Sequence, residues 1–312
     1  MEENILGIDI GGTNIKIGIV RHSGEIIYQN SFPINAFETP ETLVNQLYTH
    51  LKETNFLSTI AGIGIGAPNG NCFHGTIDFA PNLPWKGIIP LCELFEQKFG
   101  KKTMLSNDAN ATAIGENIFG AGKKYNHFVL ITLGTGLGSG IVVNNKLILG
   151  ANGYAGEFGH IRVIPNGRLC KCGRKGCLET YASATGIVRT FHELKEKHPT
   201  STLLNYENVT SKIIFETAQQ GDVFANEIIN FTAQLLGNAL ADFACFSDPQ
   251  AYILFGGMTH SNDFFTTKVQ HYMDENLLEI FKTKINVERS QLKDDDAALL
   301  GAVAVYLDRK TR

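Results

Sequence analysis

The clearest pattern in the chain is a strand, a glycine turn and a second strand near its start. In residues 5–20, ILGIDIGGTNIKIGIV, β-branched residues alternate on both sides of Gly11-Gly12, as is typical of paired strands. The segment EIIYQNSFPI predicts a third strand directly afterwards. Residues 128–143, FVLITLGTGLGSGIVV, match the first segment when the chain is shifted by 123 positions, which places Gly134 over Gly11. The sequence therefore predicts one strand–turn–strand unit that is used twice.

Helical periodicity follows each of these units. Apolar residues at steps of three and four predict a helix that starts at Thr39-Pro40, a buried helix face between Ile229 and Phe243, and a last helix from about Asp296. Two related units, each followed by strands and helices, predict a mixed α/β fold with two lobes and a cleft between them. We expect a small lobe at residues 1–118, joined by the C-terminal helix 297–312, and a large lobe at residues 119–296.

Composition and charge exclude several classes of partner. The 312 residues are 43% hydrophobic and 19% charged, which suits two folded domains. The net charge is -4 and no Lys/Arg-rich block occurs, so we expect no nucleic-acid partner. The N-terminus lacks the basic region of a signal peptide, and no run of about 18 apolar residues is present, so we expect a cytoplasmic protein without a membrane partner.

The first glycine turn has the composition of a phosphate-binding loop. In DIGGTN, Gly11 and Gly12 let the backbone approach a ligand, and consecutive N–H groups in a tight turn form a concave site for phosphate oxygens. Thr13 adds a hydroxyl donor. Lys16 in the second strand is a further candidate, and the alternative is that it points away on the opposite side of that strand. A carboxylate at Asp9 would repel phosphate unless a cation lay between them. Asp9 therefore predicts Mg²⁺, held through water.

Two further glycine sites lie in the second half of the chain. LGTGLGSG holds no acid, so it would bind phosphate through backbone and hydroxyl groups alone. Neither turn is a Walker A loop or a dinucleotide fingerprint, because G-K-[ST] is missing and neither turn opens a helix. In ILFGGM an apolar strand ends at a glycine pair, where adenosine would bind in an α/β lobe. The alternative at each site is a plain turn. The candidates are Gly134, Thr135, Gly136 and Gly138 for phosphate, and Gly256 and Gly257 for the nucleoside.

Asp108 is the candidate for the chemical step. TMLSN predicts a short strand, and the helical pattern ANATAIGENIF follows Asp108. The carboxylate thus stands at a strand-to-helix junction, where the positive end of the helix favours a negative side chain. An aspartate at this place can accept the proton of a hydroxyl that attacks the γ-phosphorus of ATP. The alternative is that Asp108 only caps the helix.

Three of the six cysteines fall within eight residues and predict a metal site. The segment GEFGHIRVIPNGRLCKCGRKGCLE joins His160 to Cys170, Cys172 and Cys177. Three thiolates and one imidazole form the closed tetrahedral set of a structural zinc, with no open position for catalysis. An iron–sulfur cluster or a redox pair are the alternatives, although C-x-C is shorter than the spacing of a thioredoxin motif.

Two glutamates flank this cluster. Glu157 precedes His160 by three residues, and Glu179 follows Cys177 by two. A zinc that holds both ends would bring the two carboxylates to one place, where they can accept hydrogen bonds from sugar hydroxyls. The second ring nitrogen of His160 would be free to meet a hydroxyl as well. The alternative is that both glutamates lie on the surface.

Together these motifs resemble the ROK family (repressors, open reading frames, kinases) of the hexokinase, Hsp70 and actin superfamily. The resemblance runs over the whole chain, from DIGGTNIKIG through GAPNG, APNLPW, NDANATAIGE, GTGLGSGIV, GEFGHI and CKCGRKGCLE to DDAALLGA. It implies a two-lobed ribonuclease H-like ATPase fold of the actin and hexokinase type. It also implies a glucokinase-like enzyme that uses ATP, Mg²⁺ and a structural Zn²⁺ and that phosphorylates a hexose, with glucose as the first choice.

The resemblance also implies roles for individual residues. Asp108 matches the catalytic base, and the glycine positions given above match the phosphate and nucleoside contacts. His160 and the three clustered cysteines match the zinc ligands. The residues that match sugar contacts are Asn82, Asn107, Asp108, Glu157, His160 and Glu179. Family members are often dimers, so a homodimer is implied.

Other activities within the same family stay open at this point. N-acetylmannosamine, allose, fructose or a β-glucoside are alternative substrates. A transcriptional repressor would need a helix-turn-helix ahead of the kinase-like body, and the first phosphate strand here begins at residue 5, so we expect none. A sugar sensor without transfer activity is a further alternative, and the presence of Asp108 argues against it.

Overall fold

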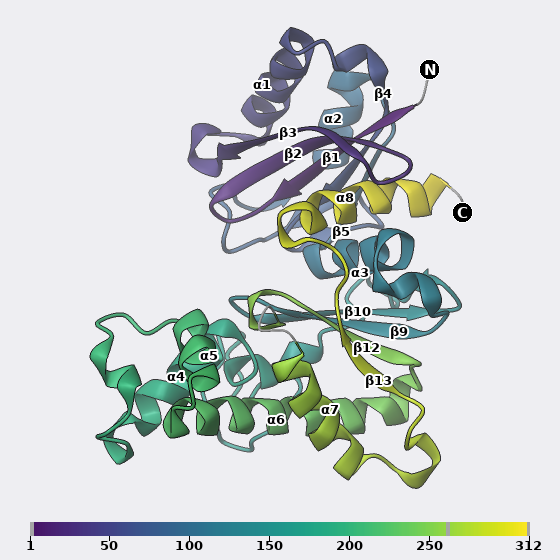
Figure 1. Ribbon diagram of the computed structural model, residues 1–312. Coiled ribbons are helices and arrows are strands. Elements are labelled where there is room, and N and C mark those ends of the chain that lie inside the picture. Colours follow the sequence, from purple (N-terminus) through teal and green to yellow (C-terminus); the bar gives the residue numbers. More distant parts are fainter. Residues whose placement is uncertain (1–2, 260–262, 311–312) are drawn as a thin grey trace. The chain divides into compact units, whose positions relative to one another are not determined.

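The chain divides into two units in the computed structural model, which describes residues 3–259 and 263–310 (Figure 1). The first unit takes its residues from Met1–Lys123, Leu149–Tyr154 and Gln291–Arg312, and the second from Lys124–Ile148 and Ala155–Ser290. Both units combine strands with helices, which confirms the α/β class. The limits of the functional lobes expected from the sequence, near residues 118 and 297, stay a prediction.

A five-stranded sheet with the order β3-β2-β1-β4-β8 forms the base of the first unit. β1 runs antiparallel to β2 and parallel to β4, and β8 continues the sheet parallel to β4. A smaller sheet has the order β5-β6-β7. The elements are β1 (Asn4–Ile10), β2 (Asn14–Arg21), β3 (Ile26–Pro33), α1 (Pro40–Glu53), β4 (Ile60–Gly66), β5 (Gly70–Asn71), β6 (Thr76–Asp78), β7 (Ile88–Ile89), α2 (Leu91–Phe99), β8 (Thr103–Ser106), α3 (Asp108–Phe119) and α8 (Asp294–Lys310), with short 3₁₀ turns at Ile34–Ala36, Leu57–Thr59 and Ala121–Lys124.

Alternation along the strands gives the two faces of this sheet different side chains. Leu6, Ile8 and Ile63 belong to one hydrophobic core together with buried residues of α1 and α2. The opposite face carries glycines, and a Cβ at Gly62 or Gly64 would overlap Tyr306 or Ala302 of α8. α8 therefore lies unusually close to the sheet, as its course beneath β1 in Figure 1 shows.

The second unit is built on a sheet with the order β11-β10-β9-β12-β13. Its hydrophobic core lies between one face of the sheet and four helices. The elements are β9 (Phe128–Leu133), β10 (Leu137–Val143), β11 (Lys146–Leu147), α4 (Ala184–Leu194), α5 (Ser211–Gln219), α6 (Val223–Ser247), β12 (Ala251–Phe255), α7 (Phe264–Asn276) and β13 (Asn286–Arg289), with 3₁₀ turns η4 (Phe158–His160), η5 (Leu178–Thr180), η6 (Lys195–Lys197), η7 (Thr202–Asn205), η8 (Gly257–Thr259) and η9 (Glu279–Phe281).

The two large sheets repeat one topology. In each, an antiparallel hairpin is followed by two parallel strands in the same spatial order, so β1, β2, β3, β4 and β8 correspond to β9, β10, β11, β12 and β13. This confirms the repeated unit expected from the sequence. The registers differ by one residue: Ile10 pairs with Ile15, whereas Leu133 pairs with Leu137. The second turn is thus one residue shorter than a uniform shift of the sequence predicts.

The predicted helices are present with small differences at their ends. The Thr39 side chain accepts a hydrogen bond from the Thr42 N–H, so Thr39 caps α1 with Pro40 at its first position, as expected. The apolar face of α6 is buried except at Phe243, which is only partly buried. α8 begins at Asp294, two residues before the expected start. None of the helices in the described part of the chain is long and apolar enough to cross a bilayer.

The close packing of α8 against the glycines of β4 predicts that a larger residue there destabilises the protein. Gly64→Ala should lower the free energy of unfolding by about 3 kcal/mol, because the added methyl group overlaps the Ala302 carbonyl and either α8 or β4 must move. Gly134→Ala is the matched control, since no heavy atom lies within 4 Å of a Cβ at Gly134; it should change stability by less than about 1 kcal/mol. Denaturant unfolding of both variants measures the difference. Equal effects would show that α8 does not pack through Gly64.

Candidate functional site

The first glycine turn joins β1 to β2 and lies beside Asn82. The Gly11 N–H donates to the Asn14 carbonyl at 2.9 Å and closes the turn. Within residues 3–259 and 263–310, no protein group accepts from the N–H of Gly12 or Thr13. A Cβ on Gly12 would lie 3.1 Å from the Asn82 carbonyl oxygen. The turn therefore keeps two backbone donors for a ligand, with Asn82 next to them.

Asp9 lies on the glycine face of the first sheet, close to the end of β4. Its Oδ1 is 3.8 Å from the position of a Cβ at Gly66. Burial raises the pKa of Asp9 to about 6, the charge of Asp108 acts in the same direction, and Lys16 opposes both. Lys16 is the ladder partner of Asp9, so the two side chains share one face of the hairpin. A carboxylate that is destabilised by burial and by a second carboxylate gains most from a nearby cation.

The structure assigns the cap of α3 to Asn107, not to Asp108. The Asn107 Oδ1 accepts from the Asn110 N–H at 2.7 Å, and Asp108 is the first residue of the helix. Asp108 is therefore not the N-cap residue of α3, because its neighbour occupies that position. Asp108 is exposed, and its Oδ1 accepts from the Ala109 N–H at 2.8 Å. Its carboxylate is held in place while its other oxygen stays accessible to a substrate.

The second glycine turn, between β9 and β10, is held from below by the start of α4. The Ala184 N–H donates to the Gly134 carbonyl at 2.8 Å, and the Thr185 hydroxyl donates to the Thr135 carbonyl at 2.7 Å. The N–H groups of Thr135 and Gly136 find no acceptor among the described residues. The turn thus presents backbone donors, while its carbonyls are engaged elsewhere. The N–H of Gly138, by contrast, donates to the Thr132 hydroxyl at 3.1 Å.

Gly256 and Gly257 follow β12 at the same edge of the second sheet. β12 is parallel to β9, and Phe255 pairs with Thr132, so both strands end beside the second turn. Gly256 has φ +116, and a Cβ there would lie 2.5 Å from the Leu133 carbonyl. Only glycine fits this conformation and this distance. The space beside Gly257 is open, because no heavy atom lies within 4 Å of the place where a Cβ on Gly257 would be.

The four predicted metal ligands lie together in the second unit. Ligand atoms of His160, Cys170, Cys172 and Cys177 are all within 4.8 Å of one another. The Cys172 and Cys177 sulfurs are 3.7 Å apart, as are the Cys170 sulfur and the His160 Nδ1. Tetrahedral zinc with Zn–S bonds near 2.3 Å places two sulfurs about 3.8 Å apart, so the residues fit this ion. Gly176 has φ +82 and packs on the Ile164 carbonyl, where a Cβ would overlap it.

Both glutamates lie against this cluster. The His160 Nε2 is 3.7 Å from the Glu157 carboxylate, and its Nδ1 is 3.6 Å from the Glu179 carboxylate. The Cys170 thiol donates to Glu179 at 2.8 Å. A Cβ on Gly136 would lie 2.8 Å from the Glu179 Oε2. Glu179 therefore lies between the metal cluster and the second glycine turn. The fold brings residues 136 and 179 together although they are far apart in the sequence.

Three residues that support these groups carry no sequence signal. Ser139 donates from its hydroxyl to the carbonyl of Gly156, the residue before Glu157. Thr185 holds the second turn, and the buried Arg168 binds the segment after Glu179. Each acts through a partner at least twelve positions away, and such partners are not visible in a local pattern. The nearest recognisable sequence signal is Ser183, a serine that caps the start of α4.

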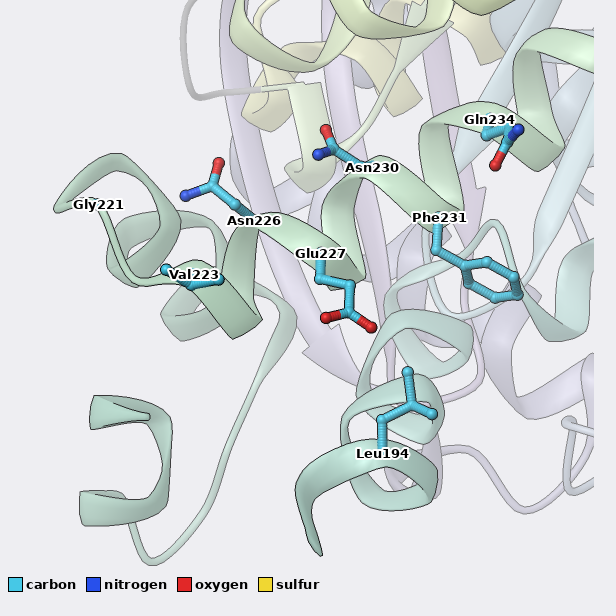
Figure 2. A pocket seen from close by; sticks show the side chains of 8 residues that line it. All are labelled: Leu194, Gly221, Val223, Asn226, Glu227, Asn230, Phe231 and Gln234. Atoms are coloured by element: carbon cyan, nitrogen blue, oxygen red, sulfur yellow. The ribbon is translucent and has the colours of Figure 1, made fainter. Parts of the chain in front are cut away.

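The second unit also holds a pocket of about 600 Å³ (Figure 2). Most of its lining comes from one face of α6, which includes Asn226, Glu227 and Phe231, with Leu194 from α4. No residue expected to bind substrate or metal lines it. Figure 2 shows its lining side chains, in which one carboxylate lies among amide and apolar groups.

Comparisons with known proteins agree with the motifs. Glucokinase of Thermotoga maritima is 32% identical over 310 residues, which cover 98% of either chain. Glucokinase of Streptomyces coelicolor is 39% identical over 266 residues, or 83% of each chain. The crystal structure of a ROK family glucokinase from Streptomyces griseus, in complex with glucose and AMPPNP, superposes with a TM-score of 0.81 at 35% identity and covers 98% of this chain and 99% of that one.

Regulators are found among the relatives as well. The xylose repressor of Caldicellulosiruptor bescii is 30% identical over 313 residues, which cover 97% of this chain and 78% of the repressor. The family model for the ROK family matches residues 5–309. With the repeated sheets and the Cys/His cluster described above, this match confirms the resemblance: the chain belongs to the ROK family and has its α/β fold of the actin and hexokinase type.

Proposed function

We propose that the protein is an ATP-dependent hexose kinase that transfers the γ-phosphoryl group of ATP to the 6-hydroxyl of glucose. The observation that carries this proposal is the state of Asp108: an exposed carboxylate at the start of α3, released from capping by Asn107. The glucokinases that resemble this chain over 83% to 98% of its length support the choice of substrate.

The nucleotide would be bound by the three glycine sites. The N–H groups without protein acceptors at Gly12, Thr13, Thr135 and Gly136 are suited to phosphate oxygens, because aligned backbone donors stabilise negative charge without reorganising. The open position at Gly257, beside the second turn, suits the nucleoside. Mg²⁺ neutralises phosphate charge when it is bound with ATP. Asp9, with Lys16 on the same face, would orient its water shell.

Each unit offers candidate groups for binding the sugar. Asn82, Asn107 and Asp108 come from the first unit, and Glu157, His160 and Glu179 from the second. The carboxylates of Glu157 and Glu179 accept from sugar hydroxyls, and the amides of Asn82 and Asn107 can donate or accept. The His160 Nδ1 faces the cysteine cluster, so its Nε2 is the nitrogen that can reach a hydroxyl.

Asp108 would act as the base in the chemical step. Its carboxylate takes the proton of the 6-hydroxyl, and the sugar oxygen forms a bond to the γ-phosphorus. The bond between that phosphorus and the bridging oxygen breaks, and ADP leaves with the electron pair. The glycine turns stabilise the charge that spreads over the phosphoryl oxygens in a loose transition state.

Zinc would have a structural role in this enzyme. His160, Cys170, Cys172 and Cys177 complete the coordination, which leaves no position for substrate. The ion would fix η4 and η5, and with them Glu157 and Glu179. In the metal-free protein burial raises the pKa of the Cys170 thiol, and its hydrogen bond to Glu179 adds to this effect, so zinc must displace a proton to bind.

A sugar sensor is the second candidate, because a repressor resembles 97% of this chain. A coupled assay of ADP release over glucose, N-acetylmannosamine, allose, fructose and a β-glucoside separates the two candidates and identifies the substrate. Sugar binding without ADP release for any of them would favour the sensor.

A homodimer and a role in the first step of glucose breakdown in the cytoplasm belong to the same proposal. Light scattering of the purified protein tests the dimer.

Asp108→Asn should lower kcat for glucose by about 100-fold or more, because the hydroxyl loses its proton acceptor. The sugar KM should change little, since an amide keeps the shape and the Asn107 cap stays intact. Steady-state kinetics over both substrates give the two constants. Near-full turnover by the variant would show that Asp108 is not the base.

Cys172→Ser should abolish stoichiometric zinc and raise the sugar KM, because η4 and η5 lose their common anchor. Cys245→Ser is the matched control, since Cys245 is an exposed thiol outside the cluster. Metal analysis of the purified proteins gives the zinc content, and calorimetry gives the sugar affinity. A wild-type protein that contains no zinc after purification in zinc-supplemented medium would contradict this part of the proposal.

Asp9 predicts a pH dependence of stability in the absence of Mg²⁺ and nucleotide. Its folded pKa, about 6, lies above the ordinary value of 3.8 for an aspartate, so the folded state binds the proton more tightly than the unfolded state. Stability from this group is therefore present below pH 4 and is lost as the pH rises through 6. Relative to Asp9→Asn, the wild type should lose about 2 kcal/mol between pH 4 and pH 7.5. Urea unfolding of both proteins at each pH measures this loss, and parallel pH profiles would contradict the prediction.

A further inference from the structure

Arg168 is the most extensively bonded side chain of the second unit, and no step described so far uses it. It lies in the segment between His160 and the cysteines, and its side chain is only 6% exposed. All five guanidinium N–H groups have acceptors. They donate to the Thr180 and Gly186 carbonyls at 2.7 and 3.1 Å, to the Thr190 hydroxyl at 2.8 Å, and to both carboxylate oxygens of Glu193 at 2.6 to 3.1 Å. The plane also stacks 4.3 Å from the Tyr181 ring centroid.

These acceptors lie at both ends of a short connecting segment. Thr180 follows Glu179 directly, and Gly186 is in the first turn of α4. Between them, the Ser183 hydroxyl donates to the Glu179 carbonyl at 2.6 Å and accepts from the Gly186 N–H at 3.0 Å. The guanidinium thus holds residues 180 and 186 on one rigid fork, which a flexible ammonium group cannot reproduce.

The same segment carries the second glycine turn. Ala184 and Thr185 donate to the Gly134 and Thr135 carbonyls, as described above. Any displacement of residues 180–186 therefore moves the turn as well as the Glu179 carboxylate. The backbone of Arg168 connects to the metal segment too, because its carbonyl accepts from the Gly176 N–H at 2.8 Å.

We propose that Arg168 is a positioning residue that sets the distance between the Glu179 carboxylate and the second glycine turn, and so aligns sugar with phosphate in the second unit. This inference rests on the proposed kinase function for the identity of the two ligands. Arg168 touches neither ligand itself; it acts through the carbonyls of Thr180 and Gly186. The Arg168 side chain is buried, so a smaller residue would leave the Thr180 carbonyl without this donor, whereas the Gly186 carbonyl would keep the Thr190 hydroxyl as a donor.

The test compares Arg168→Gln with the control Arg189→Gln. Arg189 also donates to Glu193, at 3.0 Å, but it is 45% exposed and contacts neither Thr180 nor Gly186. For folded, zinc-loaded Arg168→Gln we expect the KM for both glucose and ATP to rise by about 10- to 100-fold. Arg189→Gln should stay within about 2-fold of wild type. Circular dichroism and metal analysis establish folding and zinc content before the kinetics.

A merely structural role gives a different result. A smaller folded fraction lowers kcat and leaves each KM unchanged, and that outcome would overturn the proposal, as would equal effects of the two variants. Arg168→Lys is measured in parallel in case Arg168→Gln does not fold. It keeps the charge beside Glu193 but cannot bind both carbonyls, so its KM values should also rise; wild-type values would again overturn the proposal.

The readout also separates this inference from the proposed function. If wild-type protein phosphorylates no hexose, the kinase function fails on that result alone. Calorimetric titration with glucose and with the non-hydrolysable nucleotide AMPPNP then still tests Arg168, because both affinities should fall in Arg168→Gln and hold in Arg189→Gln. A sugar affinity that is unchanged in folded Arg168→Gln contradicts the positioning role whatever the enzyme's turnover.

Discussion

Close contact between backbone segments is the constraint on which the rest of the structure depends. In the first unit, α8 reaches the sheet because β4 carries glycine wherever its side chain would face that helix. In the second unit, the end of β12 lies against the last residue of β9, where a Cβ would fall 2.5 Å from the Leu133 carbonyl. Larger side chains at these places would separate the elements, and the turns that lie at their ends would no longer meet their neighbours.

The two units use the same topology for different chemistry. In the first hairpin the last residue but one of the leading strand is Asp9, a carboxylate whose pKa is raised by burial and further by the charge of Asp108. In the second hairpin the corresponding residue is Thr132, whose hydroxyl accepts from a backbone N–H of its own strand pair. The first unit thus has the acidic groups that suit a cation and a proton transfer, and the second has neutral donors that suit phosphate.

In the second unit, Glu179 connects the Cys/His cluster to the second glycine turn. Glu179 is in contact range of the metal cluster on one side and of the glycine turn on the other. Glu179, the Cys/His cluster and the second glycine turn are therefore parts of one packed region, and Arg168 is bonded to its connecting segment.

The sequence alone determined the features that depend on neighbouring residues. The alternation around the glycine turns, the Thr39-Pro40 helix start and the spacing of His160 and the cysteines each express a local geometry, and each is present as expected. Tertiary structure decided what depends on distant partners. It raised the pKa of Asp9 by burial and by a carboxylate 99 positions away, placed the Thr185 hydroxyl against the Thr135 carbonyl, and brought Glu179 beside Gly136. The capping of α3 by Asn107 and the length of the second turn are local features that the sequence pattern did not distinguish. Burial and charge act through space, so the pKa of Asp9 and the bonding of the buried Arg168 side chain are set only when the chain is folded.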